Sequence, residues 1–237
     1  MSAPVWCAEL AAKFWATAGT PPAFPRDLRT SVSWFPFSVV SLANLRVSTV
    51  CQWLAAKHIR TPTLEPDRRL RGCLFADGGY AYAFIDPTDP CAELRFTLAH
   101  EVGHFLRDYW HPRELARLRL GSDILDVLDG KRPVTPTERL HAVLRNATVG
   151  PFAHLLRRDE MGRPLTPGER TAEAAADRLA FELLAPAAAL EDCTDLDELR
   201  HQLEETFGLP PEPAARYTAI LLPPPEPSTL AARLRRV

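Results

Sequence analysis

Two histidines, His100 and His104, lie within an apolar stretch that has helical spacing, and this is the feature that most constrains the fold of the chain. Residues 93–109 carry enough apolar side chains for a helix that is largely buried. Histidines four positions apart lie one turn apart on one helix face, where their imidazoles can hold a single ion. Burying both rings without partners would be costly. The pattern therefore predicts a metal-binding helix over roughly these residues.

Glu101 completes the sequence His-Glu-x-x-His. Neutral imidazole nitrogen suits Zn²⁺, and a catalytic zinc site keeps one of its four positions for water. A carboxylate beside that position can take the proton of a water molecule that attacks a peptide carbonyl. We therefore expect a Zn²⁺ cofactor with His100 and His104 as ligands and Glu101 as the general base.

A third protein ligand has to come from another position. The residue six places after His104 is Trp110, and His111 comes one place later and is followed by Pro112. Asp108 and His111 therefore stay as the weaker candidates for this ligand.

Glu173 is the better-placed candidate for the third ligand. It lies in a second apolar helical stretch, residues 171–185, which Pro186 ends. Asp177 follows four positions later on the same face, where it can accept a hydrogen bond from the free N–H of a ligand histidine. The alanines at 174–176 allow this helix to approach its neighbour closely.

The rest of the chain reads as an α+β fold. Tyr80, Tyr82 and Phe84 alternate with small residues after the turn Asp77-Gly78-Gly79, which predicts a β-hairpin. Residues 108–169 form a long, mostly helical insert, and residues around Pro62 and Pro66 form an extended linker. The expected segments are helices at 5–18, 39–59, 113–128 and 136–146, the hairpin at 69–86, an apolar stretch at 152–157, and a helical pair at 196–207 and 214–222. In the helix at 39–59 the expected buried stripe is Leu42, Leu45, Val50, Trp53 and Leu54.

We expect a catalytic domain over residues 1–190 and a small helix-turn-helix-like element over residues 191–237. The element ends in a basic tail that we expect to be mobile. Its helices mix basic with acidic side chains and lack a basic face, which argues against direct nucleic-acid binding. The residues in question are Arg200, His201 and Arg216 against Glu198, Glu204 and Glu205.

Charge and cysteine content narrow the classes of partner and the cellular compartment that the chain could have. A formal net charge of −2 argues against bulk attraction to nucleic acid or acidic membrane. The five cysteines are scattered without a Cys-x-x-Cys pair, which favours free thiols in a reducing compartment. No apolar run approaches the roughly 18 residues that a membrane span needs, and the N-terminus does not read as a signal peptide. The expected location is cytoplasmic, with no membrane partner.

Two blocks of this sequence resemble the ImmA/IrrE family of metallopeptidases. The first block is residues 95–105, with Arg-Phe-Thr leading into the histidine motif, and the second is residues 173–186, which ends Leu-Leu-Ala-Pro. The hairpin before the first block and the turn Phe207-Gly-Leu-Pro also agree with the family's layout. The two blocks lie farther apart here than is usual in the family, and Asp177 stands where members often have Asn.

The resemblance implies a minimal zincin-like core, with His100, His104 and Glu173 on zinc and Glu101 as the base. It also implies a substrate class, helix-turn-helix transcriptional repressors, whose cleavage triggers a mobile-element or stress response. The alternative is a non-catalytic, zinc-containing module that binds a repressor or antitoxin partner. A peptidase would also need a group that stabilises the oxyanion, and the candidates are Tyr80, Tyr82, Tyr109 and His111.

Overall fold

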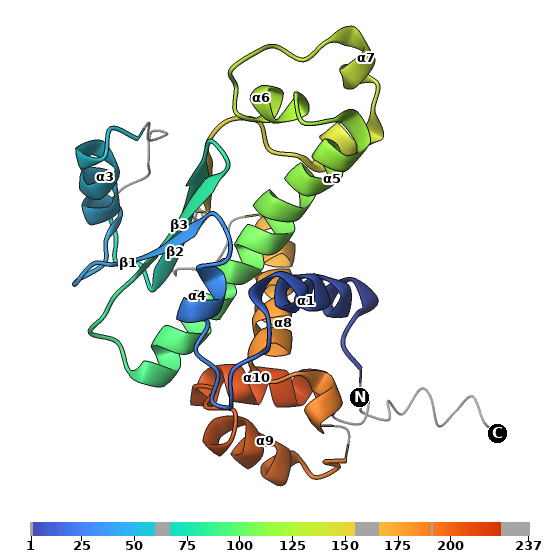
Figure 1. Cartoon of the computed structure of the whole chain (residues 1–237). Coiled ribbons are helices and arrows are strands. Elements are labelled where there is room, and N and C mark those ends of the chain that lie inside the picture. The colour runs from blue at the N-terminus through green and yellow to red at the C-terminus, as the bar shows by residue number, and fades with distance from the viewer. Residues whose placement is uncertain (1, 60–66, 155–165, 191, 224–237) are drawn as a thin grey trace, which may run out of the picture.

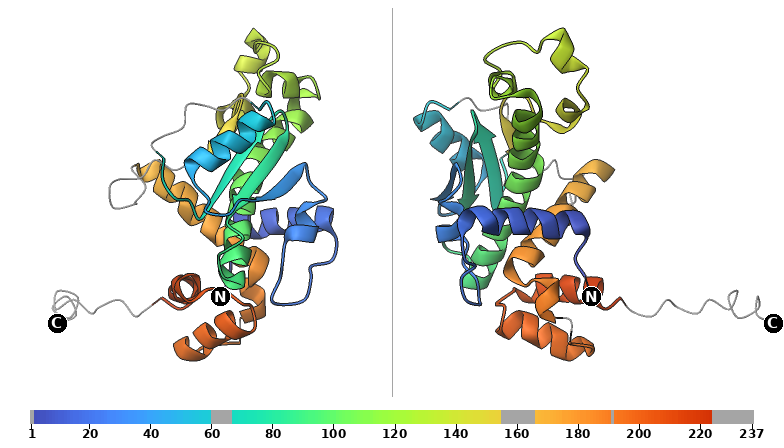
Figure 2. Two further views of the ribbon diagram at one scale, coloured as in Figure 1. Left: turned by 90° about the vertical axis from the view of Figure 1, so that its left-hand side faces the viewer. Right: turned by 45° about the vertical axis from the view of Figure 1, so that its right-hand side comes forward.

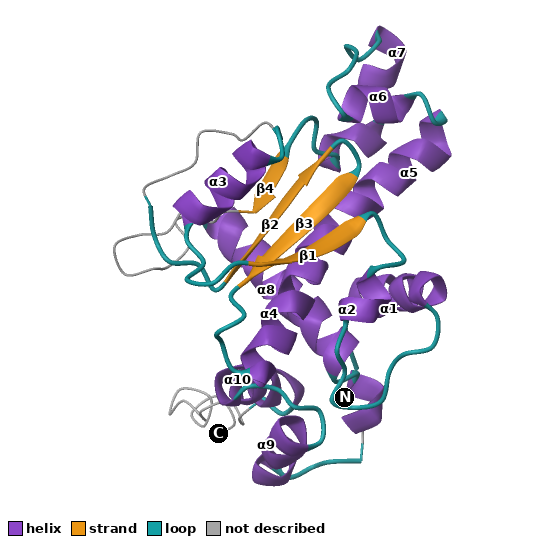
Figure 3. Ribbon diagram, turned by 60° about the vertical axis from the view of Figure 1, so that its left-hand side comes forward, coloured by secondary structure: helices purple, strands orange, loops and turns teal. Residues whose placement is uncertain are grey.

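The computed structural model describes residues 2–59, 67–154, 166–190 and 192–223. These residues form an α+β protein, which confirms the expected class: one small sheet carries α3 on one face and the long helices on the other (Figures 1 and 3). The expected linker at Pro62 and Pro66 and the basic tail lie outside the described residues. The strands are β1 (Phe37–Ser41), β2 (Gly72–Asp77), β3 (Tyr80–Ile85) and β4 (Phe152–His154). The α-helices are α1 (Val5–Ala18), α2 (Arg29–Val32), α3 (Val47–Ala56), α4 (Cys91–His104), α5 (His111–Leu120), α6 (Ile124–Leu128), α7 (Pro136–Arg139), α8 (Pro167–Leu184), α9 (Leu196–Glu205) and α10 (Pro211–Leu221).

The four strands are ordered β1-β3-β2-β4. Strands β2 and β3 form the predicted antiparallel hairpin, with Gly78 and Gly79 at positive φ in the turn. Strand β1 adds parallel to β3, and β4 adds antiparallel to β2. Neither outer strand was predicted, because each pairs with a partner that is distant in sequence.

The prediction of a helix over residues 39–59 is wrong for the first residues of this range. Residues 39–41 belong to β1, where Val39 and Val40 pair with Ala83 and Phe84 of β3. The chain turns at Asn44, which has a positive φ, and α3 begins only at Val47. β-branched side chains fit a half-buried strand well, so tertiary pairing overrides the helical pattern here. In the expected stripe Leu45, Val50 and Leu54 are buried, whereas Leu42 and Trp53 are partly buried.

The two faces of the sheet have different side chains. In the central strands β2 and β3, the face toward α4 carries small and aliphatic residues, namely Leu74, Ala76, Ala81 and Ala83. The opposite face of these strands packs against α3 and carries Cys73 and three aromatic residues, Phe75, Tyr82 and Phe84. Small side chains on the first face allow the backbone of α4 to lie close to the sheet, which positions the histidine motif against it.

Helix α4 continues into α5 without a loop, so the predicted helix extends well beyond residue 109 (Figure 2). The junction is a π-helical turn over Phe105–Trp110. Pro112, in the first turn of α5, lacks a backbone N–H and would clash with the carbonyl four residues earlier in a regular α-helix. The wider π-helical turn accommodates that proline.

Within the expected insert, residues 111–150 form a small helical cluster around α5. Ala116, Ile124, Val127 and Leu128 are its buried residues. The helix expected at 113–128 is interrupted at Gly121, which has a positive φ. The helix expected at 136–146 is replaced by the short α7 and a 3₁₀ segment at Ala142–Asn146. Residues 152–154 of the last apolar stretch form β4, and its remainder lies outside the described residues.

Helix α8 begins at Pro167, earlier than expected, because Thr166 and Glu169 form a capping box at its start. The predicted C-terminal pair is confirmed as α9 and α10. Its buried residues, including Leu199, Leu203 and Tyr217, belong to the same hydrophobic cluster as α4 and α8. Among the described residues, no helix has the length and apolar character needed to cross a membrane.

Candidate metal centre

Helix α4 holds its two histidines between the sheet and α8. Phe96, Leu98 and Val102 are buried on this helix, which fixes its rotation about its own axis. His104 is fully buried, and the side chain of His100 keeps 16% of its surface exposed. The pair therefore lies at the inner end of a site that remains accessible beside His100.

Gly103 brings α8 against α4 at the level of the histidines. A Cβ atom added at Gly103 would lie 2.8 Å from the carbonyl oxygen of Ala176 and 3.1 Å from its Cα. Only a residue without a side chain permits so close an approach of two helix backbones. This contact positions Glu173, one turn before Ala176 on α8, beside the imidazoles.

Three donor atoms from His100, His104 and Glu173 converge. The Nε2 atoms of the two histidines lie 3.2 Å apart. Glu173 Oε1 lies 3.0 Å from Nε2 of His104 and 3.6 Å from Nε2 of His100. Ligand atoms about 2.1 Å from a tetrahedral metal ion are separated by roughly 3.4 Å. The three separations therefore fit a metal ion of this size, and these residues form the group among the described ones that could hold it.

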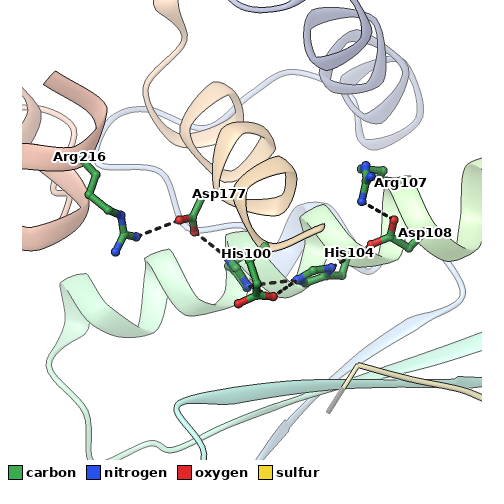
Figure 4. A network of polar contacts seen from close by, with 7 residues as sticks. His100, His104, Arg107, Asp108, Asp177 and Arg216 are labelled. Atoms are coloured by element: carbon green, nitrogen blue, oxygen red, sulfur yellow. Dashed lines mark hydrogen bonds and ion pairs between the residues drawn. The ribbon is translucent and has the colours of Figure 1, made fainter. Parts of the chain in front are cut away.

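Each histidine is supported through its other ring nitrogen. Asp177 Oδ1 lies 2.9 Å from Nδ1 of His100, and Asp108 Oδ2 lies 2.9 Å from Nδ1 of His104 (Figure 4). A carboxylate that accepts from Nδ1–H leaves the Nε2 lone pair free for a metal and fixes the ring's orientation. Asp177 occupies the supporting position that the sequence predicted. Asp108, which the sequence offered only as an alternative ligand, has this supporting contact instead.

Two arginines extend these supports outward. Arg107 Nη1 donates to Asp108 Oδ1 at 2.6 Å, and Arg216 Nη2 of α10 lies 3.1 Å from Asp177 Oδ2 (Figure 4). Sequence reasoning missed both arginines. The position of Arg107 beside Asp108 was the one local signal, whereas the contact of Arg216 depends on how α10 packs.

Glu101 lies between α4 and the sheet. It is 4% exposed, and a Cβ atom added at Gly72 of β2 would lie 2.7 Å from its Oε1. The absence of a side chain at Gly72 therefore leaves the space that this carboxylate occupies. Glu101 also acts electrostatically on His100 and His104, since it contributes to raising the pKa of both.

The electrostatics of the group favour a bound cation. Burial by itself would lower the pKa of His100, but Asp177 and Glu173 outweigh burial and raise the pKa to about 10. Burial is likewise outweighed at His104, where Asp108 and Glu173 raise the pKa. Burial would raise the pKa of Glu173, but its contacts with the two imidazoles lower it well below the usual range. The carboxylates around the two imidazoles therefore favour a positive charge at this position.

The three tyrosines that the sequence offered as oxyanion-stabilising candidates have other contacts in the structure. Tyr80 pairs with Ser38 through its hydroxyl, and Tyr82 packs on Trp53 on the sheet face opposite α4. The buried Tyr109 accepts a hydrogen bond from Gly79 N–H at 2.9 Å, which ties the hairpin turn to the helix. In these contacts the three tyrosines pack against neighbouring residues and stabilise the sheet and the hairpin turn.

His111, the other alternative ligand and oxyanion candidate, is not a member of the metal-ligand group among the described residues. Burial lowers the pKa of His111, and Lys13 of α1 lowers it further.

Comparison with known proteins gave no match: no protein-family description, no curated protein and no solved structure is significantly similar to this chain.

Proposed function

We propose that this chain is a zinc-dependent endopeptidase with a minimal zincin-like core, in which His100, His104 and Glu173 hold Zn²⁺. The observation that carries the proposal is the convergence of three donor atoms at separations of 3.0–3.6 Å, from two helices that are far apart in sequence. Imidazole and carboxylate donors suit zinc, and three protein ligands leave a fourth position for water or substrate. The two carboxylates on the Nδ1 atoms support the same assignment.

Charge balance supports a divalent ion. Four carboxylates surround the two imidazoles, and only two guanidinium groups face them, so the group has a net negative charge when both imidazoles are neutral. The carboxylates are Glu101, Asp108, Glu173 and Asp177, and the guanidinium groups are Arg107 and Arg216. A divalent cation offsets this charge, and its binding displaces any proton from the ligand nitrogens.

In this proposal Glu101 is the general base. Bound zinc supplies a Lewis acid that polarises a peptide carbonyl and lowers the pKa of water. The carboxylate of Glu101 takes a proton from the attacking water and then returns it to the leaving amine. Its enclosure by α4 and the Gly72 backbone fixes its direction, while Asp108 and Asp177 keep the imidazoles oriented.

The substrate class we propose is a helix-turn-helix transcriptional repressor, which rests on the resemblance of residues 95–105 and 173–186 to the ImmA/IrrE peptidases. The first proteins to test are small helix-turn-helix repressors, beginning with any that is encoded next to this chain. Zinc-loaded protein would be mixed with each repressor, and the products would be read by intact mass.

We expect Glu101→Gln to keep its zinc and to lose cleavage, because the ligands remain and the base does not. Glu93→Gln is the matched control, since Glu93 is a carboxylate in the first turn of the same helix and takes no part in the donor group. Cleavage by Glu101→Gln at the wild-type rate would disprove the mechanism. A stable complex without new fragments would favour the non-catalytic binding module.

A further inference from the structure

Arg216 connects three helices at the edge of the candidate metal centre. Its Nη2 lies 3.1 Å from Asp177 Oδ2 on α8, and its Nη1 donates to Glu212 Oε1 at 3.2 Å on its own helix α10. Its guanidinium carbon also lies 5.9 Å from the centre of the Phe96 ring, one turn before His100 on α4. The side chain therefore contacts both helices that supply the donor atoms.

The carboxylate of Asp177 is shared between His100 and Arg216. One oxygen, Oδ1, faces Nδ1 of His100, and the other, Oδ2, faces Arg216 (Figure 4). A carboxylate held at one oxygen can still rotate about its Cβ–Cγ bond. A second, charge-assisted contact at the other oxygen restricts that rotation and so restricts the imidazole that depends on it.

Helix α10 presents Arg216 from a well-packed position. The ring of the adjacent Tyr217 stacks on Phe181 of α8 with centroids 4.3 Å apart. The Tyr217 hydroxyl donates to the carbonyl of Ala185 at 3.2 Å. The turn that precedes α10 is also anchored, because Arg95 of α4 donates to the carbonyl of Gly208 at 3.0 Å.

The two supporting arms of the centre differ in origin. The arm behind His104 is local, since Asp108 and Arg107 belong to the same continuous helix. The arm behind His100 takes one residue each from α4, α8 and α10. The orientation of His100 therefore depends on the docking of the C-terminal helical pair, and that of His104 does not.

We propose that Arg216 is a positioning residue for the metal centre: it fixes the carboxylate of Asp177 and thereby the imidazole of His100. This inference rests on the proposed metal centre and gives the C-terminal helices a part in it. Arg216 acts through Asp177 and touches no donor atom. Its loss weakens metal binding only while Asp177 is present.

A double-mutant cycle tests this dependence. Zn²⁺ affinity would be measured by competition with a chromophoric chelator for the wild type, Arg216→Met, Asp177→Ala and the double variant. Methionine keeps an unbranched side chain that can pack on Phe96 and removes the charge. Arg200→Met is the matched control, because Arg200 on α9 is also half-exposed and paired with a glutamate four residues away.

We expect Asp177→Ala to weaken Zn²⁺ binding by about 10-fold to 100-fold, the usual range for a partner of a ligand histidine. Arg216→Met should cost less, roughly threefold to tenfold, because its side chain is 43% exposed and water screens the contact. The double variant should bind as Asp177→Ala does, and Arg200→Met as the wild type does. Thermal unfolding of each metal-free variant would show that it is folded.

Two results separate this inference from the proposal beneath it. A wild-type protein that binds no Zn²⁺ would overturn the metal centre itself, and this inference with it. If the wild type binds Zn²⁺ but Arg216→Met binds equally well, or if the two losses add in the double variant, only the role of Arg216 is overturned.

Discussion

Oε1 of Glu173 lies 3.0 Å from Nε2 of His104, although 69 positions separate the two residues in the chain. Nothing local to either residue produces this contact. It follows from the backbone of α8 touching that of α4 where Gly103 meets Ala176. Loss of either the carboxylate or the close approach should therefore weaken metal binding, and the two can be tested separately.

Glu173→Ala should bind Zn²⁺ at least about 100-fold more weakly than the wild type, because removal of a residue that only supports a ligand already costs 10-fold to 100-fold. Competition with a chelator of known affinity measures the change. The control is Glu205→Ala, an exposed carboxylate at the end of α9. Equal affinity in the wild type and Glu173→Ala would show that this carboxylate is not a ligand.

Gly103→Ala should weaken Zn²⁺ binding and lower the free energy of unfolding by about 1–3 kcal/mol, as overpacking of a close contact does. The added methyl group would meet the backbone of Ala176, so the two helices have to separate. Gly168→Ala in the first turn of α8 is the matched control, since its nearest neighbour would be 4.0 Å away. Chemical denaturation and Zn²⁺ titration of both variants measure the difference. A Gly103→Ala variant as stable as Gly168→Ala, with unchanged affinity, would contradict the role of this contact.

Zn²⁺ affinity should rise with pH between pH 6 and pH 8. Burial opposes protonation of His100, but Asp177 and Glu173 raise its pKa to about 10, so the metal has to displace a proton throughout this range. Each displaced proton contributes up to about tenfold in affinity per pH unit. Chelator competition at several pH values, corrected for the chelator's own protonation, gives the slope. A flat profile would mean that His100 is already neutral in this pH range. It would contradict the claim that Asp177 and Glu173 raise the pKa of His100.

The stability of the metal-free protein should have the opposite pH dependence. A raised pKa means that protonated His100 stabilises the fold, fully below the pKa of an unfolded histidine, about 6.5, and progressively less as the pH rises toward 10. The free energy of unfolding should therefore fall from pH 7 to pH 10 in the presence of a chelator. The His100→Ala variant should lack this part of the decline, and an identical decline in both proteins would rule it out.

The helical cluster around α5, which begins after Asp108, should be separable from the metal centre. Arg113 Nη2 donates to Asp129 Oδ1 at 2.6 Å, and both side chains are almost completely buried. Removing one partner of a buried pair typically costs about 3–5 kcal/mol, so Asp129→Asn should loosen α5 and α6. Zn²⁺ affinity should not change, because no donor of the described group comes from the insert.

The control for this prediction is Asp126→Asn. Asp126 is an exposed carboxylate that faces Lys131, as Asp129 does. Hydrogen exchange over residues 111–150 would report the loosening, and chelator competition the affinity. A fall in Zn²⁺ affinity in Asp129→Asn alone would show that the insert shapes the centre.

Several elements follow from local sequence. Helix α1, the β2–β3 hairpin and the α9–α10 pair were predicted close to their observed bounds, because their apolar spacing and turn residues specify them without distant partners. Strand β1 was missed for the opposite reason. Phe37 pairs with Ala81, far along the chain, and a short apolar stretch beside a helix carries no local sign of that pairing.

In the metal centre, too, local sequence specifies some features and tertiary packing specifies the others. The sequence by itself determined that His100 and His104 share one helix face, because their four-residue spacing and helical geometry are local properties. It also identified Glu173 and Asp177 as candidates, without excluding Asp108 as a ligand. Only the tertiary structure decided which carboxylate meets the Nε2 atoms and which supports an Nδ1 atom. The physical reason is that these contacts depend on how closely two distant helix backbones pack, and no spacing within either helix specifies that distance.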